Sequence, residues 1–285
     1  MTTLSTAPGE ALCIGRFELA LPAGWSVSGR SQHLYYTAAS DAPAPPTAMA
    51  ATGDPALPLL RLGLSSRAPL ARRFELEGVG PAAWFGLGAV DSVDRRLVAL
   101  AGTPAERVRL ETMATAGREP AAEKGLRLIA AGYRPGLRRG FCLERGAFVL
   151  EPTSTERTEL VAQTPALPGV KLSLDTHALS KPATEDPLAG AVAELQALGG
   201  QGSTVKVVLQ APRTVAGLAG TDWRAEFSVP GSPPRLVYRF HFPGLAKQAA
   251  APAIMIALDL PLAQRAQGDA AWEQLLGSMQ AVPAR

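Results

Sequence analysis

Three histidines, His33, His177 and His241, are the candidates for an imidazole base or a metal ligand in this sequence. They are isolated from one another, and only His177 has an acidic neighbour at a useful spacing, in the segment Asp175-Thr-His177. A carboxylate two residues before a histidine lies on the same face of a strand, where it can orient the ring for general base catalysis. An acid and a histidine at the end of a strand more often bind loop backbone or solvent, and we favour that interpretation.

The spacing patterns on which most enzymes depend are missing from the sequence. It contains no Gly-x-Ser-x-Gly, no His-Glu-x-x-His, no Gly-x-Gly-x-x-Gly and no phosphate loop ending in Gly-Lys-Ser/Thr. The nearest approach, Gly199-Gly-Gln-Gly202, follows a predicted helix and precedes a predicted strand, which reverses the order of a phosphate-binding loop. We therefore predict a protein that is not an enzyme and that has no cofactor and no metal site.

Two cysteines are too few for a disulfide-rich scaffold or for a zinc site made of cysteines alone. Cys13 opens the segment Cys-Ile-Gly-Arg-Phe-Glu-Leu-Ala-Leu-Pro, and Cys142 opens a similar one, Cys-Leu-Glu-Arg-Gly-Ala-Phe-Val-Leu-Glu-Pro. This weak repeat indicates two domains that begin alike. The equivalent positions of Cys13 and Cys142 are compatible with a disulfide between them and equally with two buried reduced thiols.

The charge of the chain and the length of its apolar runs argue against nucleic-acid binding and against a membrane span. A net charge of +3, with arginines interleaved with acids, makes a nucleic-acid partner a poor hypothesis. No apolar run is long enough to cross a membrane, and residues 1–12 show no signal peptide. The densest basic cluster lies beside a predicted linker, where it fits an acidic partner surface or a solvated junction: Arg134, Arg138, Arg139 and Arg145.

Alternating residues predict a β-hairpin in the second half of the chain. The run from Trp223 to Val229 places apolar residues on one face, with Arg224 among those on the other, and the run from Leu236 to Phe242 alternates in the same way. The turn between them is Pro230-Gly-Ser-Pro-Pro234. We expect one buried face and one solvent-facing face, with His241 on the exposed one.

Other segments complete a prediction of an α+β fold with two domains, each a mainly antiparallel sheet with a few covering helices. The length of 285 residues and the repeat place these domains at 1–133 and 138–285, with a linker over 132–140. Helical spacing predicts helices over 121–131, 187–198 and 269–280. Strands are expected at 25–37, 59–65, 170–174, 205–209 and 254–260, with a loop from Asp41.

Five segments together carry a family likeness: residues 13–22, Gly140-Phe-Cys-Leu-Glu-Arg-Gly146, Ser173-Leu-Asp-Thr-His177, Gly217-Leu-Ala-Gly220 and Trp272-Glu-Gln-Leu-Leu276. In these segments the chain resembles the two-domain immunity proteins that protect bacteria from type VI secretion phospholipase effectors. The likeness is clearest from about residue 138 onward. It implies that the motif residues are a structural framework, namely Gly15, Arg16, Arg145, Gly146, Asp175, His177, Gly217, Gly220 and Trp272.

The resemblance implies a periplasmic antidote that binds a cognate lipase and covers its entrance without breaking any bond. The contact residues do not transfer from the family, because partner surfaces differ between cognate pairs, and the absence of a signal peptide keeps a cytoplasmic location open. Two alternatives have other consequences. A non-catalytic envelope or secretion-apparatus accessory protein would not neighbour a lipase gene, and a hydrolase using Asp175 and His177 would lose activity on His177→Ala.

Overall fold

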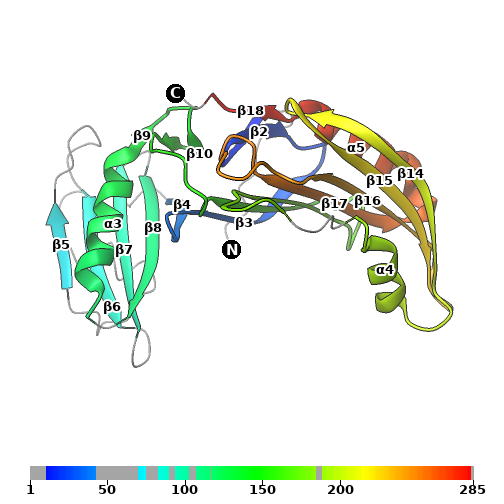
Figure 1. The fold of residues 1–285 in the computed structure, drawn as a ribbon, viewed down its shortest axis with the longest axis horizontal. Coiled ribbons are helices and arrows are strands. Elements are labelled where there is room, and N and C mark those ends of the chain that lie inside the picture. Colours follow the sequence, from blue (N-terminus) through cyan, green and yellow to red (C-terminus); the bar gives the residue numbers. More distant parts are fainter. Residues whose placement is uncertain are drawn as a thin grey trace. The chain divides into compact units, whose positions relative to one another are not determined.

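The computed structural model of the chain describes residues 11–42, 70–74, 83–89, 94–102, 107–115, 117–183 and 188–283. These residues form two compact units, each assembled from separate stretches of sequence (Figure 1). Unit 1 takes residues 11–12, 17–30 and 152–281, and unit 2 takes residues 13–16, 31–151 and 282–283. Each unit thus mixes residues from 1–133 and 138–285, and the assignment of those two ranges as separate domains stays a prediction.

A mainly antiparallel sheet forms the centre of unit 1. Its strands lie in the order β14, β15, β16, β17, β13, β12 and the first part of β3. Their bounds are β14 (Thr204–Val215), β15 (Leu218–Ser228), β16 (Arg235–Phe242), β17 (Ala253–Pro261), β13 (Lys171–His177), β12 (Arg157–Gln163) and β3 (Ser26–Leu34). A small sheet adds β1 (Ala11–Ile14), β2 (Phe17–Ala20) and β18 (Gln280–Ala281).

Helices cover both faces of the unit 1 sheet. On one face, α4 (Ala191–Gly199) buries Leu195 against a cluster that includes Trp223 and Val237. The other face is covered by α5 (Arg265–Ser278), which follows the 3₁₀ helix η1 (Leu262–Gln264) and stacks its Trp272 on Tyr238 with ring centroids 5.4 Å apart. The central strands are therefore buried on two sides.

This arrangement corrects the prediction of a hairpin with one wet face. Residues paired across antiparallel strands point to the same side of a sheet, and Trp223 pairs with Arg239 while Arg224 pairs with Tyr238. The apolar stripe of β15 therefore faces α4, whereas the stripe of β16 faces α5. His241 is only 8% exposed, so its predicted exposure is wrong.

The main strands of unit 2 are antiparallel and are covered by one helix. The latter part of β3 is followed in the sheet by β4, β8, β7, β6 and β5, with bounds Thr37–Ala42, Arg107–Thr115, Asp94–Gly102, Ala83–Ala89 and Leu70–Phe74. Helix α3 (Glu119–Gly132) lies on β7 and β8 and buries Leu126 and Ile129 against Leu97 and Leu110 (Figure 1). The α+β prediction is confirmed by these sheets and helices.

The segment predicted as a linker belongs to the body of unit 2. Tyr133 to Pro135 form β9, which pairs with β11 (Gly146–Phe148), and β11 pairs with β10 (Phe141–Leu143). The predicted helices correspond to α3, α4 and α5, and α5 begins and ends earlier than expected. The predicted strand over 59–65 lies outside the described residues, as does most of the loop that follows Asp41.

Candidate functional site

The candidate catalytic pair lies in a row of ion pairs on the surface of unit 1. The Asp175 carboxylate contacts His177 Nδ1 at 3.2 Å and accepts a hydrogen bond from Arg157 Nη2 at 3.0 Å. Arg157 also pairs with Glu159 at 2.7 Å. The row lies on the outer side of β12 and β13, and the side chains of Arg157 and His177 are about half exposed.

The surroundings of Asp175 stabilise its ionised form. Burial raises the pKa of the Asp175 carboxyl, but the hydrogen bonds with His177 and from Arg157 lower this pKa by more than burial raises it. The net pKa of Asp175 therefore lies below the usual range. An open hollow of about 280 Å³ in the same unit is lined by residues 152–154, 178–180 and 247–249, so neither Asp175 nor His177 contributes to it. The pair forms a solvated ion-pair row, and such rows add little to stability.

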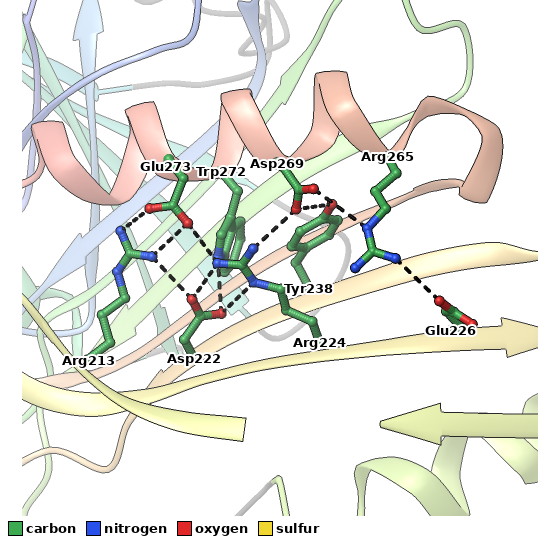
Figure 2. Close-up of polar contacts among 9 residues, drawn as sticks. All are labelled: Arg213, Asp222, Arg224, Glu226, Tyr238, Arg265, Asp269, Trp272 and Glu273. Carbon is green, nitrogen blue, oxygen red and sulfur yellow. Dashed lines mark hydrogen bonds and ion pairs between the residues drawn. The ribbon is translucent and has the colours of Figure 1, made fainter. Parts of the chain in front are cut away.

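Among the described residues, an extensive polar cluster lies between α5 and the sheet of unit 1 (Figure 2). At its centre is Asp222 on β15, which is 3% exposed. Its carboxylate accepts hydrogen bonds from Arg213 at 3.1 Å, from Arg224 at 2.7 Å and from Trp272 Nε1 at 3.2 Å. Because a buried carboxylate without partners is costly, these donors make the position of Asp222 compatible with the fold.

Helix α5 is joined to this cluster through its own acids. Glu273 accepts a bidentate pair from Arg213 at 2.8 and 3.0 Å, and Asp269 accepts hydrogen bonds from Arg224 and from the Tyr238 hydroxyl. The Arg213 and Arg224 guanidinium groups hold the pKa of Glu273 at about 2, while burial together with the bond to Asp269 raises the pKa of Tyr238. Each of these acids has an arginine partner inside the cluster, which indicates a structural joint between helix and sheet.

Four of the predicted framework residues gather around a disulfide in unit 2. Cys13 and Cys142 are bonded, with Cα atoms 5.6 Å apart, and both are fully buried. Gly15, with φ of 58°, exchanges two backbone hydrogen bonds with Cys142, and the Arg16 carbonyl accepts one from Val282. The two copies of the sequence repeat are thus joined directly at their cysteines.

The other two residues of this group fix the small sheet beside the disulfide. The Arg145 amide donates to Asp41 Oδ1 at 3.0 Å, and its carbonyl accepts from the Tyr133 hydroxyl at 3.1 Å. A Cβ on Gly146 would lie 2.5 Å from the Arg134 carbonyl oxygen, so only glycine fits there. Of the basic residues that were predicted as a patch, Arg134 thus lies on β9 of this sheet, and Arg145 lies in the turn between β10 and β11.

Gly217, Gly220 and Trp272, three more residues of the predicted framework, lie in unit 1. Gly217 has φ of 80° in the tight turn between β14 and β15, where Ala216 also has a positive φ. A Cβ on Gly220 would lie 2.5 Å from the His241 carbonyl oxygen. Trp272 is fully buried.

Two features of the fold escaped the sequence analysis. Asp222 and Arg224 carry no motif, and their alternation with apolar residues is typical of a solvent face. The turn Tyr35-Tyr36 between β3 and β4 was missed because it lacks the glycine or asparagine that signals a hairpin. In this turn Tyr36 is 83% exposed, more than any other large apolar side chain among the described residues.

One family model matches more than half of the chain. The model of the Tle cognate immunity protein 4 C-terminal domain matches residues 137–282. The chain belongs to the Tle cognate immunity protein 4 family. The matched range contains the disulfide cysteine Cys142, the whole polar cluster beside α5 and the row of ion pairs around Asp175. A comparison with curated proteins finds no match.

Three solved structures share the fold across nearly the whole chain. The apo immunity protein TplEi of the type VI secretion system of Pseudomonas aeruginosa is 17% identical, with a TM-score of 0.72 over 96% of this chain and 97% of its own. The Tle4–Tli4 complex gives 15% identity and a TM-score of 0.72 over 99% and 100%. TplEi bound to an "L" peptide gives 14% identity and a TM-score of 0.71 over 98% and 100%.

The described residues form neither a membrane-spanning helix nor a group of metal ligands. No described helix combines the length and the apolar character needed to span a bilayer. Within the same residues, no three side chains of His, Cys, Asp or Glu converge as metal ligands would.

Proposed function

We propose that this protein binds a cognate type VI secretion lipase effector and occludes the entrance to its active site, so protecting the producing cell from its own toxin. The observation that carries the proposal is the match of residues 137–282 to the immunity-protein family. The fold likeness to an immunity protein solved in complex, Tle4–Tli4, supports it over almost the full length of the chain. Inhibition by occlusion requires a rigid surface and no chemistry.

A non-enzymatic mechanism is part of the proposal. The candidate pair Asp175 and His177 lies in an exposed ion-pair row and its hydrogen bonds are to each other and to Arg157. The buried polar groups around Asp222 hold α5 to the sheet through hydrogen bonds. Neither of these two clusters requires a catalytic role, and the proposed mechanism is binding alone.

The proposed location is the periplasm, and the disulfide supports it. Disulfides persist in oxidising compartments such as the bacterial periplasm and are rare in the cytosol. Cys13 and Cys142 are fully buried and join chain segments 129 residues apart, which is typical of a structural bridge. Expression with and without an export signal, followed by thiol labelling of the denatured protein, tests this location. Labelled thiols in the exported protein would contradict it.

The test of function uses the lipase encoded beside this protein. The two proteins are co-expressed and co-purified, and phospholipase activity is titrated against increasing immunity protein. We expect a stable complex and complete inhibition at one stoichiometric end point. His177→Ala should inhibit as well as the unaltered protein, and the immunity protein alone should hydrolyse no lipid. A lipase that stays fully active in the presence of excess protein would refute the proposal.

A further inference from the structure

The hairpin between β3 and β4 in unit 2 ends in a turn of unusual composition. β3 ends at Leu34 and β4 begins at Thr37, so the loop consists of Tyr35 and Tyr36. Their φ angles are 50° and 60°, the pattern of a type I′ turn, which Asn and Gly normally occupy because larger side chains are disfavoured there. Two tyrosines in this turn oppose the local backbone preference.

The two tyrosines have different environments. Tyr35 packs against the core of unit 2, and its hydroxyl donates to the Glu151 carbonyl at 2.6 Å. Tyr36 is held by its backbone, since its carbonyl accepts a hydrogen bond from Thr112 Oγ1 at 3.3 Å, while its side chain is 83% exposed. Packing therefore explains the identity of Tyr35 but leaves that of Tyr36 without a role in the fold.

The strand that contacts the backbone of Tyr36 carries an exposed methionine and a paired set of charges. Met113, the residue after Thr112 on β8, is 51% exposed. On the same side of β8, Arg109 and Glu111 form an ion pair with each other. A rigid turn that presents an aromatic ring and a methionine beside self-neutralised charges complements an apolar, uncharged surface.

We infer that Tyr36, with Met113 beside it, anchors this protein on its lipase effector by filling an apolar recess of the effector's surface. The inference rests on the proposed function. An enzyme that accepts acyl chains must present apolar surface where they enter, which matches the chemistry of the turn. Exposed tyrosines on rigid supports are favoured as binding hot spots because little conformational entropy is lost when they are buried. Residual strain in the backbone is then retained for binding, as at other functional sites.

The decisive variant is Tyr36→Asn, because asparagine suits a positive φ. It should raise the melting temperature of the immunity protein by about 1–3 °C while raising the Kd for the neighbouring lipase by at least about thirtyfold, mainly through faster dissociation. A residue with a purely structural role would not separate stability from affinity in this way. Both quantities are measured on the full chain, by differential scanning calorimetry and by surface plasmon resonance with the purified lipase.

Ala216→Asn is the matched control. Ala216 also has a positive φ, 53°, in the two-residue turn between β14 and β15 of unit 1, and carries no exposed aromatic ring. This variant should gain stability with a Kd within about twofold of the original. A change of less than about tenfold in Kd for Tyr36→Asn, while the unaltered protein binds and inhibits, overturns the inference and leaves the proposed function standing. Failure of the unaltered protein to bind the lipase overturns both.

Discussion

Removing the disulfide should destabilise unit 2 far more than unit 1. The bridge joins Cys13 to Cys142 across 129 residues, and that loop contains most of unit 2 but not the strands β12 to β17 of unit 1. The chain-entropy relation for a loop of this length gives about 5 kcal/mol. Because whole domains are stable by only about 5–15 kcal/mol, the loss would remove a large share of the stability of unit 2.

The variant to make is Cys13→Ala with Cys142→Ala, since alanine leaves no buried thiol or hydroxyl without a partner. We expect the transition of unit 2 to move down by roughly 10–20 °C. Amide exchange measured by mass spectrometry should lose protection in β7, β8 and α3 while β15, β16 and β17 keep theirs. Treating the unaltered protein with a reductant able to reach the bridge should reproduce the result and so serves as the control without substitution. Equal melting temperatures, or protection lost evenly across both units, would refute the reasoning.

The remaining predictions concern the α5 joint and one glycine. Trp272→Phe removes the indole donor to Asp222 and part of a fully buried ring, so the free energy of unfolding should fall by about 2–3 kcal/mol in urea denaturation. Glu273 has a folded pKa of about 2, below its ordinary value, so its contribution to stability is complete above about pH 4.5 and is lost as the pH falls toward 2. Glu273→Gln should therefore flatten the acid limb of a stability–pH curve measured between pH 2 and 5, and an unchanged curve would contradict this assignment. Gly220→Ala places a Cβ 2.5 Å from the His241 carbonyl oxygen and should cost roughly 1–3 kcal/mol, whereas Gly125→Ala, in helix α3 with open space around it, should be neutral or stabilising in the same thermal melts.

The sequence was sufficient to predict the elements of the second half of the chain. The helical spacing of Trp272, Leu275 and Leu276 and the alternation in β17 each reflect a local period that the fold preserves. These helix and strand predictions succeeded because each depends on neighbours along the chain. The repeat placed Cys13 and Cys142 at equivalent positions but left open whether they form a disulfide, which the structure shows.

The register of the β15–β16 hairpin could not be predicted in the same way. Strand alternation assigns residues to two faces but does not say which face of one strand matches which face of the next. A shift of one residue would bring Trp223 and Tyr238 to the same side, whereas the observed pairing of Trp223 with Arg239 separates them. The burial of Asp222 follows from that register, and so the cluster under α5 was beyond the reach of pattern analysis.

For a related reason, the sequence did not predict which stretches of the chain make up unit 2. Its members lie in three separate stretches, and no periodic pattern links residues 13–16 or 282–283 with the strands between them. Turn chemistry also failed at Tyr35 and Tyr36, where both residues depart from the preference of the turn they form. Departures of this kind are expected where a position is selected for more than folding.

The interleaving of the two units also sets an order in time. Val282 packs beside the disulfide and donates its amide hydrogen to the Arg16 carbonyl, while the Pro283 carbonyl accepts from Gly140. These residues leave the ribosome roughly 130 positions after Glu151, the last residue of the main stretch of unit 2. The last contacts of unit 2 can therefore form only after nearly all of unit 1 has been synthesised. A nascent chain that pauses before residue 282 would carry an incompletely folded unit 2.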